Sequence, residues 1–278
     1  MDFIDVKLPS KPAKIELRGP TGAGKTFIGL TLAQTFAGDK PYAFLDSESG
    51  RGMLFARMFN FKYASLSGSY PPQKYVEAIN SAVKAGMGAL LLDSLTQAWN
   101  GVGGVLDQVN ASSGNKFTDG WGKIGTPLQS QFTNAIISAP IPLVCTVRTK
   151  MGYEITTNES GKKVPLQIGL QPEQRDGLSY EFDYIIDISM DHVGTITKMP
   201  PMGLMDNQIP ADGYVDFAQK IIDWMATGEM QPQTWADIKA KTGVEGHLYE
   251  YARQLNKDGK TVKEAWALIT AEMAEVAP

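Results

Sequence analysis

Residues Gly19–Thr26 have the sequence GPTGAGKT, and together with their flanking segments they restrict the fold more than any other part of the chain. Before them, Lys14–Arg18 alternates apolar and polar residues, which predicts a β-strand. After them, Phe27–Phe36 is mostly apolar and is closed by Ala37-Gly38, which predicts a largely buried helix. A strand, a glycine-rich turn and a helix in this order form a Walker A phosphate loop. The sequence therefore predicts an α/β fold built around a P-loop.

The residue types in this loop suit nucleotide phosphates. Glycines let successive backbone N–H groups turn inward around phosphate oxygens, and the N-terminus of the following helix favours an anion. The Lys25 ammonium is expected to reach the β- and γ-phosphates, and the Thr26 hydroxyl to ligate Mg²⁺, so ATP and Mg²⁺ are the expected cofactors. The residues expected to bind the nucleotide are Gly19, Pro20, Thr21, Gly22, Ala23, Gly24, Lys25 and Thr26.

Two other apolar segments end in acidic residues. Gly88–Asp93 is a predicted strand, and a doubly wound sheet binds its ligand at the carboxyl ends of its strands. Asp93 is therefore expected to hold Mg²⁺ through water, the alternative being that it caps the next helix. Tyr42–Asp46 is the second such strand, and Glu48 follows it at a place suited to orienting and deprotonating water. The alternative is that Asp46 or Glu48 caps a helix that starts near Arg51.

Pro142–Arg148 is a further predicted buried strand. Thr146 lies near its end, where a polar side chain would contact the γ-phosphate and report hydrolysis. The alternative is a threonine that is hydrogen-bonded within the sheet.

Composition narrows the class of protein. The 278 residues carry a net charge of −4, which argues against a generally basic surface for nucleic acid but leaves a local groove open. One cysteine and two histidines exclude an internal disulfide and argue against a structural zinc site. The first ten residues are unlike a secretory signal, and no apolar run is long enough to span a bilayer. A cytoplasmic protein without membrane contact is expected.

The order of these segments resembles the RecA-like branch of P-loop ATPases. The corresponding sequences are GPTGAGKT, FLDSES, LLLDSL and LVCTVRTK. Val164–Lys198 is similar to a phage-encoded group of these ATPases that includes the Sak-type single-strand annealing proteins, through Gln174–Gly177, Tyr180–Asp183 and a strand pair ending at Lys198. The resemblance covers about residues 14–198. It implies a mainly parallel sheet flanked by helices, and it implies that the protein is located in the cytoplasm of a bacterial host.

The resemblance also implies roles for particular residues. Glu48 corresponds to the catalytic glutamate, and Thr146 occupies the sensor position, where RecA has glutamine. Lys198 stands where related proteins offer a basic side chain to the nucleotide of a neighbouring subunit; the alternative is a solvated lysine on a strand. Self-association into a ring or filament follows from this arrangement.

RecA-like proteins hold single-stranded DNA with two loops, which correspond here to Asn110–Gly120 and Thr149–Gln174. Basic side chains with nearby aromatics, such as Phe117 and Trp121, suit a site that follows a DNA backbone and stacks its bases. The alternative is an exposed hairpin with solvated lysines and its turn at Asn158–Gly161. The basic residues expected to contact DNA are Lys116, Arg148, Lys150, Lys162, Lys163 and Arg175.

The chain is predicted to divide into an ATPase core, residues 1–228, and a small helical region, residues 229–278. In the second region, Thr261 with Glu264 forms a predicted capping box, and Trp266, Ile269 and Met273 share one helix face.

The leading hypothesis is an Mg²⁺-dependent ATPase that acts on single-stranded DNA in phage recombination, by annealing or strand exchange. A single-strand DNA-binding protein is one partner that this hypothesis suggests. A DNA motor, meaning a helicase or helicase loader, is one alternative. A nucleotide-dependent switch or assembly protein without DNA binding is the other.

Overall fold

A computed structural model describes residues 11–157, 163–202, 207–227, 234–242 and 246–276. The chain divides into two compact units, one extending to Ile221 and the other beginning at Ile222.

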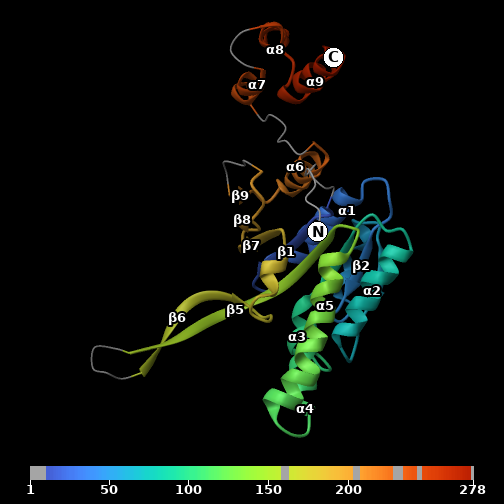
Figure 1. The fold of residues 1–278 in the computed structure, drawn as a ribbon, viewed down its shortest axis with the longest axis vertical. Coiled ribbons are helices and arrows are strands. Elements are labelled where there is room, and N and C mark those ends of the chain that lie inside the picture. Colours follow the sequence, from blue (N-terminus) through green and yellow to red (C-terminus); the bar gives the residue numbers. More distant parts are fainter. Residues whose placement is uncertain (1–10, 158–162, 203–206, 228–233, 243–245, 277–278) are drawn as a thin grey trace, which may run out of the picture. The chain divides into compact units, whose positions relative to one another are not determined.

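The larger unit contains a mostly parallel sheet, as the sequence predicted (Figure 1). The strands that continue the sheet beyond β7 are antiparallel, and β6 pairs with β5 outside this order of strands. In spatial order the strands are β3 (Lys62–Ser65), β2 (Ala43–Asp46), β4 (Leu90–Asp93), β5 (Leu143–Thr157), β1 (Lys14–Gly19), β7 (Tyr184–Ile188), β8 (Gly194–Lys198) and β9 (Gln208–Ile209), with β6 at Lys163–Pro172.

Helices cover both faces of the parallel part of this sheet. Leu90 and Leu92 pack on one face in a core with residues of α2 (Pro72–Lys84) and α5 (Thr126–Ser138). Leu91, which points to the other face, lies directly beneath Gly29 of α1 (Lys25–Ala37). Because successive side chains of a strand alternate between faces, a strand buried on both sides is apolar throughout, as Leu90–Leu92 is. The larger unit also contains the helices α3 (Leu95–Asn100) and α4 (Val105–Ala111), the short 3₁₀ segments η1 (Arg51–Arg57) and η3 (Leu178–Glu181), and the ten-residue π-helix η2 (Lys116–Gly125). Helix α6 (Tyr214–Thr227) includes residues of both units.

Strand β5 continues past the sheet as a hairpin with β6. It pairs with β1 as far as Arg148, and from Thr149 it pairs with β6, which runs antiparallel from Lys163 to Pro172. In Figure 1 this ribbon extends away from the sheet. The segment Thr149–Gln174, which the resemblance identified with a DNA-binding loop, therefore consists largely of paired strands, and its turn lies outside the described residues.

The smaller unit contains three helices with a core of their own. They are α7 (Trp235–Thr242), α8 (His247–Lys257) and α9 (Val262–Val276). Trp266 and Ile269 are buried in this core. The predicted capping box is present: Glu264 N donates to Thr261 Oγ1 at 3.3 Å, and Thr261 N donates to the Glu264 carboxylate at 2.9 Å. In the part of the chain that the structure describes, no helix is both long and apolar enough to cross a membrane.

Candidate nucleotide site

The P-loop joins the end of β1 to the start of α1 and has an anion-binding geometry. Gly22 and Gly24 have φ angles of 90° and 85°, which glycine adopts without strain. Helix α1 starts at Lys25 with no side-chain cap and no acidic residue in its first turn. Its N-terminal N–H groups and its dipole therefore favour an anion placed over the loop.

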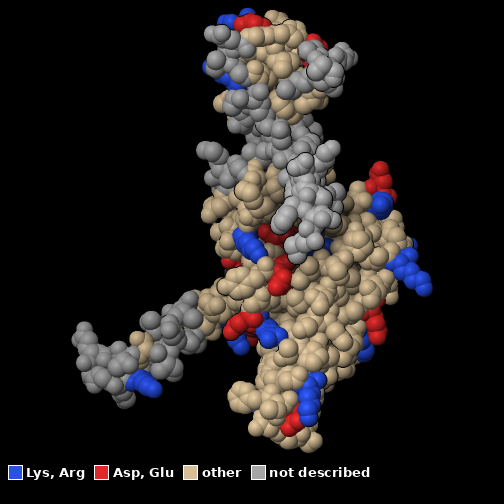
Figure 2. Space-filling view, in the orientation of Figure 1, with Lys and Arg blue, Asp and Glu red and all other residues tan. Residues whose placement is uncertain are grey.

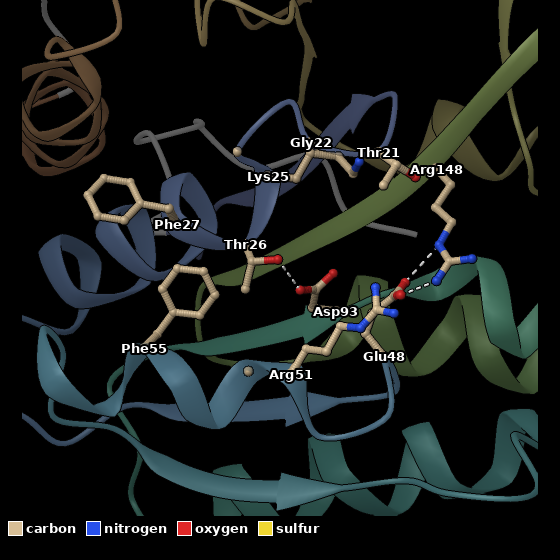
Figure 3. A pocket seen from close by; sticks show the side chains of 12 residues that line it. Thr21, Gly22, Lys25, Thr26, Phe27, Glu48, Arg51, Phe55, Asp93 and Arg148 are labelled. Carbon is tan, nitrogen blue, oxygen red and sulfur yellow. Dashed lines mark hydrogen bonds and ion pairs between the residues drawn. The ribbon is translucent and has the colours of Figure 1, made fainter.

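A pocket of about 470 Å³ lies over this loop, within the usual range for a small-molecule site (Figure 3). It gathers side chains from the ends of β1, β2, β4 and β5, because the carboxyl ends of parallel strands meet at one edge of the sheet. Of the residues expected at the site, those that line it are Thr21, Gly22, Gly24, Lys25, Thr26, Glu48 and Asp93.

Lys25 is held within the loop. Its Nζ donates to the carbonyl oxygens of Gly19 and Pro20, each at 2.8 Å. Burial lowers the pKa of the Lys25 ammonium, and the carboxylates of Asp93 and Glu48 act against that shift. Phosphate oxygens at this place would oppose the effect of burial in the same way.

Asp93 is buried between two hydroxyl donors. Thr26 Oγ1 donates to Asp93 Oδ2 at 2.6 Å, and the Thr146 hydroxyl donates to Oδ1. Burial raises the pKa of the Asp93 carboxyl, and these two hydrogen bonds act in the opposite direction. The neighbouring hydroxyl and carboxylate oxygens of Thr26 and Asp93 are the ligand type that Mg²⁺ prefers, so they fit the ion. Thr146, proposed as a sensor, is hydrogen-bonded to Asp93.

Asp46 and Glu48 have different surroundings. The Asp46 carboxylate accepts hydrogen bonds from Glu48 N at 2.6 Å, Gly52 N at 2.8 Å and the Tyr63 hydroxyl at 2.8 Å. It therefore organises the turn after β2 and the start of η1, whose N-cap is Gly50. The Glu48 side chain instead enters the pocket, where it is paired with Arg148 (Figure 3).

The pocket also contains residues that sequence reasoning did not assign to it. Phe27, Arg51 and Phe55 line it, the first directly after the Walker A threonine and the others on η1. Arg148, expected at DNA, lies here against Glu48. The only sequence signal for these residues is their proximity along the chain to Thr26, Glu48 and Thr146.

A second cavity, of about 860 Å³, lies between α3, η2 and the base of the hairpin, and we call it the Trp121 groove. The ring centroids of Trp99 and Trp121 are 5.9 Å apart, and the Arg175 guanidinium lies 6.0 Å from the Trp121 ring. The aromatic and charged residues that line this groove include Trp99, Phe117, Trp121, Lys150, Glu173 and Arg175.

Among the described residues, the groove does not include Lys116 or Lys163, which were also predicted to contact DNA. Lys116 Nζ donates to the backbone and side chain of Asn110, each at 3.1 Å. Lys163 is exposed at the start of β6, and Lys162 lies outside the described residues. On the face drawn in Figure 2, positive and negative side chains are interspersed among the described residues.

Lys198 lies away from the P-loop of its own chain. It pairs with Ile185 near the start of β7, whereas the P-loop follows β1 next to the end of β7. Its Nζ donates to the Tyr180 carbonyl at 2.6 Å.

Comparison with known protein families gives one match. A family model described as an AAA domain matches residues 11–209, which include the whole parallel sheet and both cavities. No curated protein matches the chain significantly.

Proposed function

The chain belongs to the AAA domain family, a family of nucleotide-binding P-loop ATPases, and from this premise we propose that it hydrolyses ATP with Mg²⁺ and acts on single-stranded DNA. The observation that carries the ATPase part is the meeting of Lys25, Thr26, Glu48 and Asp93 in one pocket over the loop.

Each of these residues has a distinct task in the proposed reaction. Lys25 and the N–H groups of the loop bind the phosphates, and Thr26 and Asp93 hold Mg²⁺. When bound there, the ion would neutralise part of the phosphate charge. Glu48 orients the attacking water and accepts its proton.

The apolar side of the pocket suits the nucleotide base. Phe27 and Phe55 line it together, while the charged residues line the opposite side (Figure 3). Aromatic rings provide apolar contact area to a flat purine. We therefore place the adenine against Phe27 and Phe55.

The Trp121 groove supports the DNA part of the proposal. It joins aromatic faces with the cations Lys150 and Arg175, the combination that stacks bases and follows a phosphate backbone. The proposed process is annealing or strand exchange in phage recombination, as the resemblance to Sak-type proteins implies, with a single-strand DNA-binding protein as a possible partner.

Assembly belongs to the same proposal. Because Lys198 lies at the far end of β7, a nucleotide that it contacts would belong to a neighbouring copy in a ring or filament. Unwinding of duplex DNA by the purified protein would favour a helicase or helicase loader over this proposal. ATPase activity that oligonucleotides leave unchanged would favour a nucleotide-dependent switch without DNA binding.

The ATPase proposal predicts the behaviour of two variants. Lys25→Ala should lower kcat for ATP hydrolysis at least about 100-fold, because it removes a cation from the developing phosphate charge. Glu48→Gln should bind ATP but turn over about 100-fold more slowly, because it removes the proton acceptor. Phosphate release measures turnover, and a fluorescent ATP analogue measures binding. Lys84→Ala, an exposed lysine on α2, is the control. Wild-type turnover in the Lys25→Ala variant would contradict the proposal.

The DNA proposal predicts a loss of affinity when the groove loses an aromatic ring. Phe117 is 82% exposed, so Phe117→Ala should leave the fold intact. Binding of a fluorescent oligo-dT strand should weaken roughly tenfold, because a base loses its stacking partner. Tyr180 is equally exposed and lies outside the groove, so Tyr180→Ala should bind as wild type does. Equal affinities for all three proteins would contradict this position of the DNA.

A further inference from the structure

The carboxylate of Glu48 has donors on both of its oxygens. Arg148 Nε donates to Glu48 Oε1 at 2.8 Å, and Arg148 Nη2 pairs with Oε2. The Ser94 hydroxyl also donates to Oε1 at 2.9 Å. A bidentate guanidinium holds a carboxylate in one orientation. A base engaged in this way must exchange a donor before it accepts a proton from water.

Arg148 occupies the point at which β5 leaves the sheet. Its parallel pairing with Gly19 of β1 is the last before the hairpin begins at Thr149. The Arg148 N–H donates to Thr96 Oγ1 at 3.0 Å, and its carbonyl accepts from Glu173 N at 2.8 Å. The backbone that carries the guanidinium is therefore held by α3 on one side and by the end of β6 on the other.

Both of those supports belong to the Trp121 groove or adjoin it. Glu173 lines the groove, and its carboxylate lies 3.7 Å from Lys150 Nζ. The buried Gln174 side chain donates to the Leu95 carbonyl at 2.8 Å, next to Ser94. A polyanion that binds Lys150 competes with the Glu173 carboxylate for this lysine. Glu173 is in turn joined to Arg148 by the hydrogen bond from its backbone N–H to the Arg148 carbonyl.

We propose that Arg148 is a positioning residue that restrains Glu48 until single-stranded DNA enters the Trp121 groove. DNA shifts the junction between β5 and β6, Arg148 withdraws from Glu48, and the carboxylate turns to the attacking water. This inference rests on the proposed function, in particular on Glu48 as the proton acceptor. The side chains of Arg148 and Glu48 are 35% and 18% exposed, so the ion pair is partly screened by solvent and a binding event can break it.

The test compares steady-state ATP hydrolysis with and without oligo-dT for the wild-type chain and for Arg148→Met. The wild type should be stimulated by oligo-dT. Arg148→Met should hydrolyse ATP several-fold faster than the wild type without DNA, and its ratio of stimulated to basal rate should fall toward one. Affinity for a fluorescent ADP analogue should stay within about twofold of wild type, which separates release of Glu48 from a change in nucleotide binding.

Two further variants keep the test decisive if Arg148→Met fails to fold. Thr96→Val removes the acceptor of the Arg148 N–H while preserving side-chain shape, and should raise the basal rate in the same direction by a smaller factor. Arg148→Lys retains the charge without the bidentate contact, and should retain part of the stimulation.

A basal rate at or below wild type in both Arg148→Met and Thr96→Val would overturn the inference, as would a wild type that oligo-dT does not stimulate. Loss of all hydrolysis in Arg148→Met, with nucleotide binding intact, would make Arg148 a direct contributor to the reaction and overturn it as well. A wild type that does not hydrolyse ATP would instead refute the proposed function.

Discussion

Among single residues, Lys14 has the least ordinary surroundings. It lies on β1 with no exposed surface, and its Nζ donates to the carbonyls of Ala139 and Ile141, each at 2.7 Å. Ala139 and Ile141 lie in the connection between α5 and β5, so the ammonium satisfies carbonyl groups of that connection. Burial is the larger effect and lowers the pKa of Lys14 to about 8, although Asp183 acts against it.

This pKa predicts that the free energy of unfolding rises between pH 8 and pH 9.5. The unfolded chain retains the Lys14 proton up to its ordinary pKa of 10.5, so in this range the unfolded state binds more protons than the folded state. The contribution of Lys14 should therefore increase by roughly 1 to 2 kcal/mol. Urea unfolding at each pH measures it. Lys14→Met should lack this slope, and an identical slope in both proteins would show that other groups cause it.

The residues that the sequence identified most directly are those whose place follows from local geometry. The glycines of the P-loop, Lys25 and the strand-end Asp93 were identified because each occupies a definite place in a strand, a turn or a helix start. The sequence favoured Glu48 as the base, but the choice between Asp46 and Glu48 as a cap for the following helical turn was open. It depends on Tyr63 and Gly52, which are hydrogen-bonded to Asp46 only after β2 pairs with β3.

At the scale of elements, η1 forms a wall of the nucleotide pocket. A Cβ on Gly52 would lie 2.3 Å from the Phe44 ring, so only glycine lets η1 approach β2 this closely. That approach brings Arg51 and Phe55 to the pocket. The sequence predicted a helix starting near Arg51, but not that its side chains would reach the nucleotide.

The position of Phe55 predicts a base-specific loss of affinity. Phe55→Ala should weaken binding of ATP by roughly 3- to 10-fold, because the adenine loses an aromatic contact. Binding of inorganic tripolyphosphate, which has no base, should be unchanged. Competition against a fluorescent ATP analogue measures both. Leu54, which is 77% exposed and outside the pocket, supplies the control Leu54→Ala. Equal losses for ATP and tripolyphosphate would place the base elsewhere.

At the scale of the whole molecule, the order of strands decides which side chains meet. Strand β4 lies between β2 and β5, and β1 lies between β5 and β7. Glu48 follows β2 and Asp93 ends β4, so both meet at the P-loop, whereas Thr146 lies within β5 and is hydrogen-bonded to Asp93. The C-terminal unit has its own core, and its boundary with the ATPase core, predicted near residue 228, stays a prediction.

By itself the sequence determined that the chain forms an α/β P-loop fold, and it indicated the residues that we propose bind phosphate and metal. Those signals are local, since they depend on the period of a strand and the turn that follows it. Only the tertiary structure decided that Arg148 faces Glu48, 100 positions away, and that Trp99, Trp121 and Arg175 form one groove. Such contacts depend on which strands become neighbours in the sheet. Hydrophobic periodicity predicts the individual strands but does not predict their spatial order.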